Sequence, residues 1–124
     1  MVRPHILVAE DEEGIRESLN LILSRDYAVT FAANGQEALD HLAQARFDLI
    51  LLDIKMPKVD GLEIMRYLQR QSSAPAVLIL TAYQSVEMAK EAVKLGAVDY
   101  ISKPFDRAHV LATVHEILTR SPAA

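Results

Sequence analysis

The 124-residue sequence contains no cysteine, so neither disulfides nor thiolate metal sites are available to it. Its longest apolar runs are far too short to cross a bilayer, and no membrane role is expected. Positive charge is scarce as well. Thirteen Lys and Arg against 17 Asp and Glu give a net charge of -4, which argues against a nucleic-acid surface, so any DNA role would need another module.

The first residues, 1–5, lead into an apolar run without the hydrophobic region of a signal peptide, so we expect a cytoplasmic protein. Hydrophobic residues make up 51% and charged residues 24% of the chain, as in ordinary globular domains. This length suits one domain over 1–124 that buries about two thirds of its unfolded surface. We expect a core over about 4–120 and a short disordered tail, 121–124.

Five short apolar runs alternate with five amphipathic stretches, which predicts a (βα) unit repeated five times. The expected strands cover 5–9, 28–32, 48–53, 76–81 and 98–102; the expected helices cover about 12–24, 36–44, 60–70, 85–95 and 106–120, with a turn at Asn34-Gly35 and a helix cap at Ser85. Such alternation favours an α/β, doubly wound (βα)5 flavodoxin-like domain. Its parallel sheet would have the order 2-1-3-4-5, with helices on both faces.

Asp53 ends the most apolar run, in which four consecutive aliphatic residues are typical of a strand buried on both faces. In open α/β sheets the functional groups gather at the carboxyl ends of the strands. Taken alone, Asp53 is equally consistent with a residue that only terminates its strand.

The other strand ends favour a functional reading. Glu10 and Asp11 follow the first strand, which the expected strand order places beside Asp53, and such a carboxylate cluster is a ligand set for Mg²⁺. Thr81 ends the fourth strand and Lys103 follows the fifth, where a hydroxyl and an ammonium suit a phosphoryl group. Glu12 and Glu13 are interpreted instead as first-turn acids on a solvated helix face, and the four histidines as structural.

Together these segments resemble the receiver domains of bacterial two-component response regulators over essentially the whole chain. The segments that carry the resemblance are Val8–Glu12, Leu51–Pro57 with Asp60-Gly61, Leu80–Ala82, and Gly96–Tyr100 with Lys103–Phe105. The region of the fourth helix and Gly96–Tyr100 is similar to receivers of sigma-54-type transcriptional activators.

The resemblance implies a role for each matching residue. Asp53 would accept a phosphoryl group from a sensor histidine kinase. Mg²⁺ would bind Asp11, Asp53 and the backbone carbonyl of Lys55, with Glu10 acting through a metal-bound water. Residues that would bind the phosphoryl group or report it are Thr81, Lys103 and the switch residue Tyr100, and the Lys103-Pro104 bond would be cis.

In the same family reading, phosphorylation would change the face formed by helix four, strand five and helix five, and so control an output domain or downstream protein. A homodimer through that face is a further hypothesis. Glu10 stands where Asp is commoner in the family, and Lys55, with Tyr83, would influence the lifetime of the acyl phosphate. Whether the receiver stands alone or belongs to a longer regulator stays open.

Three other functions are open to this fold. A phosphohydrolase with an aspartate nucleophile needs an acid two residues after it, where this chain has Lys55. A nucleotide or flavin site needs a loop rich in Gly or hydroxyls after the first strand, where the acids at 10–13 would repel phosphate. A degenerate receiver would lack some of the functional positions, all of which are present.

Overall fold

The computed structural model describes residues 3–54, 56, 58–82 and 86–120 of the chain. Five strands alternate with five helices. In chain order they are β1 (His5–Ala9), α1 (Glu13–Leu23), β2 (Ala28–Ala32), α2 (Gly35–Gln44), β3 (Leu49–Asp53), α3 (Gly61–Gln69), β4 (Ala76–Ala82), α4 (Val86–Lys94), β5 (Asp99–Lys103) and α5 (Arg107–Thr119).

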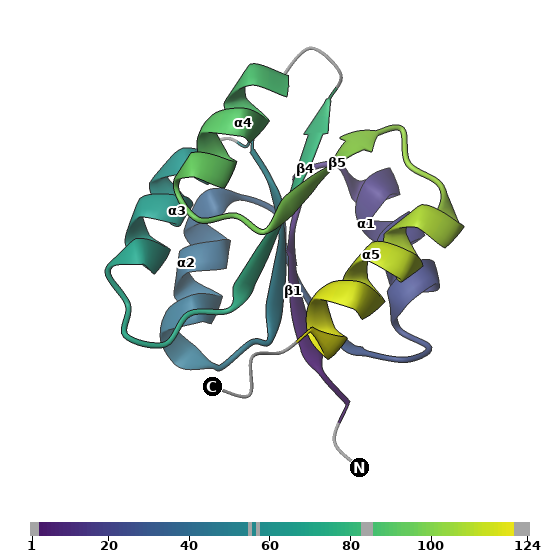
Figure 1. The fold of residues 1–124 in the computed structure, drawn as a ribbon. Helices are drawn as coiled ribbons and strands as arrows, with labels where there is room; N and C mark the ends of the chain where they lie inside the picture. Colours follow the sequence, from purple (N-terminus) through teal and green to yellow (C-terminus); the bar gives the residue numbers. More distant parts are fainter. Residues whose placement is uncertain (1–2, 55, 57, 83–85, 121–124) are drawn as a thin grey trace.

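All neighbouring strands are parallel, and their order is β2-β1-β3-β4-β5. The helices form a layer on each side of the sheet, with α2, α3 and α4 on one face and α1 and α5 on the other (Figure 1). The predicted doubly wound fold is therefore confirmed. None of the described helices has both the length and the apolar character needed to span a membrane.

Strand β3 lies at the centre of the sheet, and every one of its residues is buried. Because side chains alternate along a strand, Ile50 and Leu52 join the core under α2, α3 and α4, whereas Leu49 and Leu51 join the core under α1 and α5. Burial of each such side chain stabilises the fold by about 2–3 kcal/mol. The continuous apolar run is thus explained by helices on both faces of the strand.

Most element boundaries agree with the sequence predictions, but the predicted turn at Asn34-Gly35 is wrong. Asn34 is the N-cap of α2, since its side chain accepts a hydrogen bond from the Glu37 backbone N–H, and Gly35 is already helical. Asp60 and Asp106 cap α3 and α5 in the same way.

The last two strands differ by one residue from the predicted ranges. β5 begins at Asp99 instead of Val98 and includes Lys103, because its ladder with β4 runs from the Leu78–Asp99 pair to the Ala82–Lys103 pair. β4 continues to Ala82, one residue past Thr81. The predicted cap Ser85 and the tail 121–124 lie outside the described residues.

Candidate functional site

The parallel register aligns the carboxyl ends of four strands. Ala9 pairs with Leu52, so the residues that follow them, Glu10 and Asp53, are neighbours across the β1–β3 ladder. Beyond β3, Leu80 lies opposite Asp53, and Ala82 lies opposite Lys103. The sheet thus brings the predicted site residues to one edge.

Three carboxylates converge there. Glu10, Asp11 and Asp53 each offer an oxygen atom, and these atoms lie within 4.8 Å of one another. Glu10 is fully buried and Asp53 is 5% exposed, whereas Asp11 is exposed. An all-oxygen set that is open to solvent on one side suits a hard divalent cation such as Mg²⁺, which keeps several waters when bound.

The Glu10 carboxylate has one oxygen that fits such a cation. Its Oε2 accepts a hydrogen bond from the Glu12 backbone N–H at 3.0 Å. Its Oε1 is buried without a hydrogen bond of acceptable geometry, although the Lys103 ammonium lies 2.7 Å away as an ion pair. This oxygen therefore retains acceptor capacity. The predicted ligand at the Lys55 carbonyl lies outside the described residues.

Lys103 supplies a positive charge inside the cluster. Its Nζ lies 2.7 Å from Glu10 Oε1, 3.2 Å from Asp53 Oδ2 and 3.7 Å from Glu12 Oε1, and its side chain is 13% exposed. Burial, the largest single influence, lowers the pKa of Lys103, but its contacts with Glu10 and Asp53 together outweigh burial and raise the pKa above its usual value. The ammonium is therefore a fixed counter-ion for the buried carboxylates.

Thr81 and Tyr100, the predicted switch pair, lie on the two strands beyond β3. Thr81 is fully buried, and its hydroxyl donates a hydrogen bond to the Ala82 carbonyl at 3.1 Å. Tyr100 is partly buried and packs against the core on the side of α2, α3 and α4. It also lines a surface hollow that contains His109.

The cluster has two contacts that the sequence did not predict. Arg16 of α1 donates from Nη1 to the backbone carbonyls of Glu10 and Asp11, both at 2.9 Å. Glu12 was interpreted as a solvated helix acid, and its side chain is indeed 64% exposed, but it lies 3.7 Å from Lys103. Neither contact has a sequence signature, because one uses backbone acceptors and the other depends on strand order.

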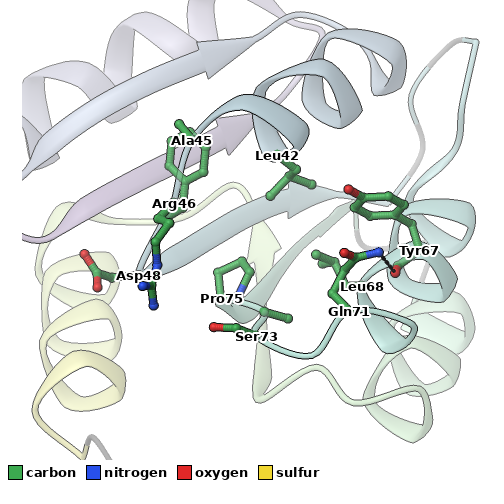
Figure 2. A pocket seen from close by; sticks show the side chains of 11 residues that line it. Leu42, Ala45, Arg46, Asp48, Tyr67, Leu68, Gln71, Ser73 and Pro75 are labelled. Atoms are coloured by element: carbon green, nitrogen blue, oxygen red, sulfur yellow. Dashed lines mark hydrogen bonds between the residues drawn. The ribbon is translucent and has the colours of Figure 1, made fainter.

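A separate hollow lies elsewhere on the molecule. It has a volume of about 280 Å³ and lies at the amino ends of the strands, the opposite edge of the sheet from Asp53. Its lining combines apolar side chains such as Leu42 and Pro75 with the polar side chains of Arg46 and Gln71, all labelled in Figure 2. It contains none of the carboxylates at the other edge, so it is not part of the candidate site.

Comparisons with known proteins agree with this arrangement. The family model of the response regulator receiver domain matches residues 6–115. The chain is 38% identical to the uncharacterized transcriptional regulatory protein YkoG of Bacillus subtilis, over 98% of this chain and 54% of YkoG. It is 39% identical to sporulation initiation phosphotransferase F of the same organism, over 95% of this chain and 96% of that protein.

Among solved structures, full-length FixJ from B. japonicum superposes with a TM-score of 0.91 at 34% identity, covering 99% of this chain and 61% of FixJ. The chain spans about half to three fifths of the length of several curated relatives that it matches.

Proposed function

The chain belongs to the response regulator receiver domains, and within this family of phosphoacceptor switches we propose that Asp53 is the residue that accepts the phosphoryl group. A receiver is a switch of two-component signalling rather than a catalytic enzyme. The donor would be a phosphohistidine of a sensor histidine kinase. In the transfer the P–N bond breaks, a P–O bond forms at a carboxylate oxygen of Asp53, and the released imidazole takes up a proton.

The observation that carries this proposal is the grouping around Asp53. Its carboxylate is nearly buried, it lies within 4.8 Å of oxygens of Glu10 and Asp11, and Lys103 Nζ is 3.2 Å from its Oδ2. An anionic nucleophile can receive a dianionic phosphoryl group only where positive charge offsets the repulsion. Lys103 provides part of that charge.

Mg²⁺ would supply the rest. We propose that Glu10, Asp11, Asp53 and the backbone carbonyl of Lys55 form its site, with Glu10 acting through a bound water. A bound Mg²⁺ would neutralise charge on the phosphoryl oxygens. On the protein side, Lys103 would bind one phosphoryl oxygen, and the Thr81 hydroxyl would exchange its bond to the Ala82 carbonyl for a bond to another.

Phosphorylation would then act as a switch of shape. Movement of Thr81 would leave space that the ring of Tyr100, on the neighbouring strand β5, would fill. The face formed by α4, β5 and α5 would change, and with it the contact to an output domain or downstream protein. This is a two-state equilibrium that the phosphate shifts only through its preference for one state.

The wider context is proposed on the relatives. Several of them are transcriptional regulators by name, so we propose transcription as the output, in a cytoplasmic protein without direct nucleic-acid binding by this domain. The likeness to sigma-54-type receivers rests on α4 and Gly96–Tyr100. A phosphorylation-linked homodimer through the α4–β5–α5 face is part of the same proposal, as is a folded unit over about 4–120.

The experiment is mass spectrometry of the purified domain after incubation with Mg²⁺ and a small phosphodonor. We expect one added phosphoryl group that acid or alkali removes. Asp53→Asn should abolish it, whereas Asp48→Asn, at an exposed position just before the same strand, should leave it unchanged. An unchanged mass of the parent domain, or equal labelling of Asp53→Asn, would refute the assignment.

A further inference from the structure

Arg16 carries a positive charge at a position in its helix where such a charge is unfavourable. It is the fourth residue of α1, and positive charge in a first turn opposes the helix dipole. Among the described residues its guanidinium pairs with no carboxylate; Nη1 donates instead to the backbone carbonyls of Glu10 and Asp11. Both carbonyls belong to the loop that presents the acidic pair.

One of these carbonyls shares a peptide unit with an amide that serves the site. The carbonyl of Asp11 and the N–H of Glu12 are the two ends of one planar trans peptide, so they point in opposite directions. Arg16 holds the carbonyl end at 2.9 Å, and the N–H end donates to Glu10 Oε2 at 3.0 Å. The orientation of this single peptide is therefore fixed from both sides.

The same series of contacts continues to the centre of the site. With Oε2 of Glu10 held by the amide, its Oε1 faces the Lys103 ammonium at 2.7 Å, and that ammonium reaches Asp53 Oδ2 at 3.2 Å. A charged donor at the outer end polarises the peptide and strengthens the amide as a donor to the carboxylate. The Glu10 side chain is longer than that of Asp by one methylene and has more rotamers, so its carboxylate is more dependent than an Asp carboxylate on a contact that holds it in place.

We infer that Arg16 is a positioning residue for the metal site: through the Asp11–Glu12 peptide it fixes the carboxylate of Glu10, and thereby raises the affinity of the acidic cluster for a divalent cation. This inference rests on the proposed function, because it assigns the cation to that cluster. Groups that orient metal ligands typically change metal affinity by about 10–100-fold.

A purely electrostatic role and a positioning role of Arg16 predict opposite changes in the affinity for a divalent ion, so an experiment can distinguish them. If Arg16 acted only through its charge, Arg16→Met would remove a repulsive cation and tighten binding of a divalent ion. If it positions the ligands, the same variant weakens binding. Arg16→Lys keeps the charge on a shorter side chain and should lie between the parent and Arg16→Met. Arg25→Met, an exposed arginine just beyond α1, removes the same charge as a control.

The metal measurement uses Mn²⁺, whose free form gives an electron paramagnetic resonance signal that disappears on binding. We expect Arg16→Met to weaken Mn²⁺ binding about tenfold or more and Arg25→Met to leave it within about twofold. In the Glu10→Gln background the effect of Arg16→Met should shrink, because both substitutions disrupt the same contact. Equal or tighter binding by Arg16→Met would overturn the inference.

The metal-free protein provides a second readout that does not depend on the proposed function. The Glu12 amide proton, which donates to a carboxylate, should resonate downfield in a proton–nitrogen correlation spectrum and move upfield in Arg16→Met but not in Arg25→Met. An unmoved Glu12 amide would refute the positioning role. If the parent protein binds no Mn²⁺ at all, the metal site of the proposed function fails together with this inference. Normal parent binding that Arg16→Met leaves unchanged would refute the inference alone.

Discussion

Lys103→Met should destabilise the metal-free domain far more than the loss of an ordinary surface lysine. The substitution keeps the aliphatic stem and removes the ammonium that lies between Glu10, fully buried, and Asp53, 5% exposed. Removal of one partner from a buried ion pair costs about 3–5 kcal/mol, because the other charge stays buried and uncompensated. The contact with Glu12 adds little, since that side chain is 64% exposed.

We take about 3 kcal/mol as the expected loss, the lower end of that range, because Asp11 is exposed and water reaches one side of the cluster. For a domain of this size that corresponds to a fall in Tm of roughly 10–15 °C. The matched control is Lys90→Met, whose partner Glu87 lies at 3.5 Å with both side chains largely exposed. This pair should contribute less than about 1 kcal/mol.

The assay is urea unfolding in EDTA, followed by circular dichroism, for the parent and both variants. Repetition in Mg²⁺ should restore part of the stability of Lys103→Met, since a ligand that binds only the folded state adds about 2.7 kcal/mol at one hundred times its Kd. Equal losses for Lys103→Met and Lys90→Met in EDTA would refute the view that Lys103 is the counter-ion of the buried carboxylates.

Three further outcomes follow from the structure. The free energy of unfolding should fall at alkaline pH. A group whose pKa is raised on folding stabilises the fold below its unfolded pKa and loses that contribution as the pH rises. Lys103 is such a group, and Tyr27 is another, because burial of its phenol, aided by Asp26, raises its pKa. Urea titrations above about pH 10 should show a smaller decline in Tyr27→Phe and in Lys103→Met than in the parent, and an unaltered decline in both would contradict this assignment. Gly61→Ala should destabilise by about 1–3 kcal/mol, since its Cβ would lie 2.7 Å from the Ile54 Cα, whereas Gly14→Ala, with open space around it, should stabilise by about 0.5–1 kcal/mol in the same assay. Asn34→Ala should remove the cap of α2 and lower the free energy of unfolding by about 1 kcal/mol, and an unchanged value would mean that the cap is replaced by water.

The fold was predictable because its local signals agree with one another. The run Leu49–Leu52 is apolar at every position, as is typical of a strand that is covered on both faces. In the structure all four side chains are fully buried. Asp60 and Asp106 precede helices and cap them as their residue types suggest. Asn suits turns and N-caps equally well, so its residue type does not distinguish the two at position 34. The distinction depends on whether its side chain accepts a hydrogen bond from the backbone N–H three residues later, here that of Glu37.

The site was predictable only as a set of strand ends. The strand order places Glu10 beside Asp53, and that order is the one that five alternating strands and helices most often adopt. The sequence does not specify that Lys103 reaches both carboxylates, because the answer depends on side-chain rotamers across three strands. Arg16 was invisible for a different reason: its acceptors are backbone carbonyls, which every residue type has.

The position of Lys103 bears on how the domain could respond to phosphorylation. In the structure its ammonium holds Glu10 and Asp53 together, and in the proposed phosphorylated state it would also bind a phosphoryl oxygen on Asp53. An ammonium has three donors, so the new contact need not break the contact to Glu10. The charge that stabilises the resting cluster would then also stabilise the modified one, and Lys103 alone would give little preference for either state. The preference would then have to come from groups whose contacts differ between the states, and in the proposed mechanism the Thr81 hydroxyl, bound here to the Ala82 carbonyl, would be such a group.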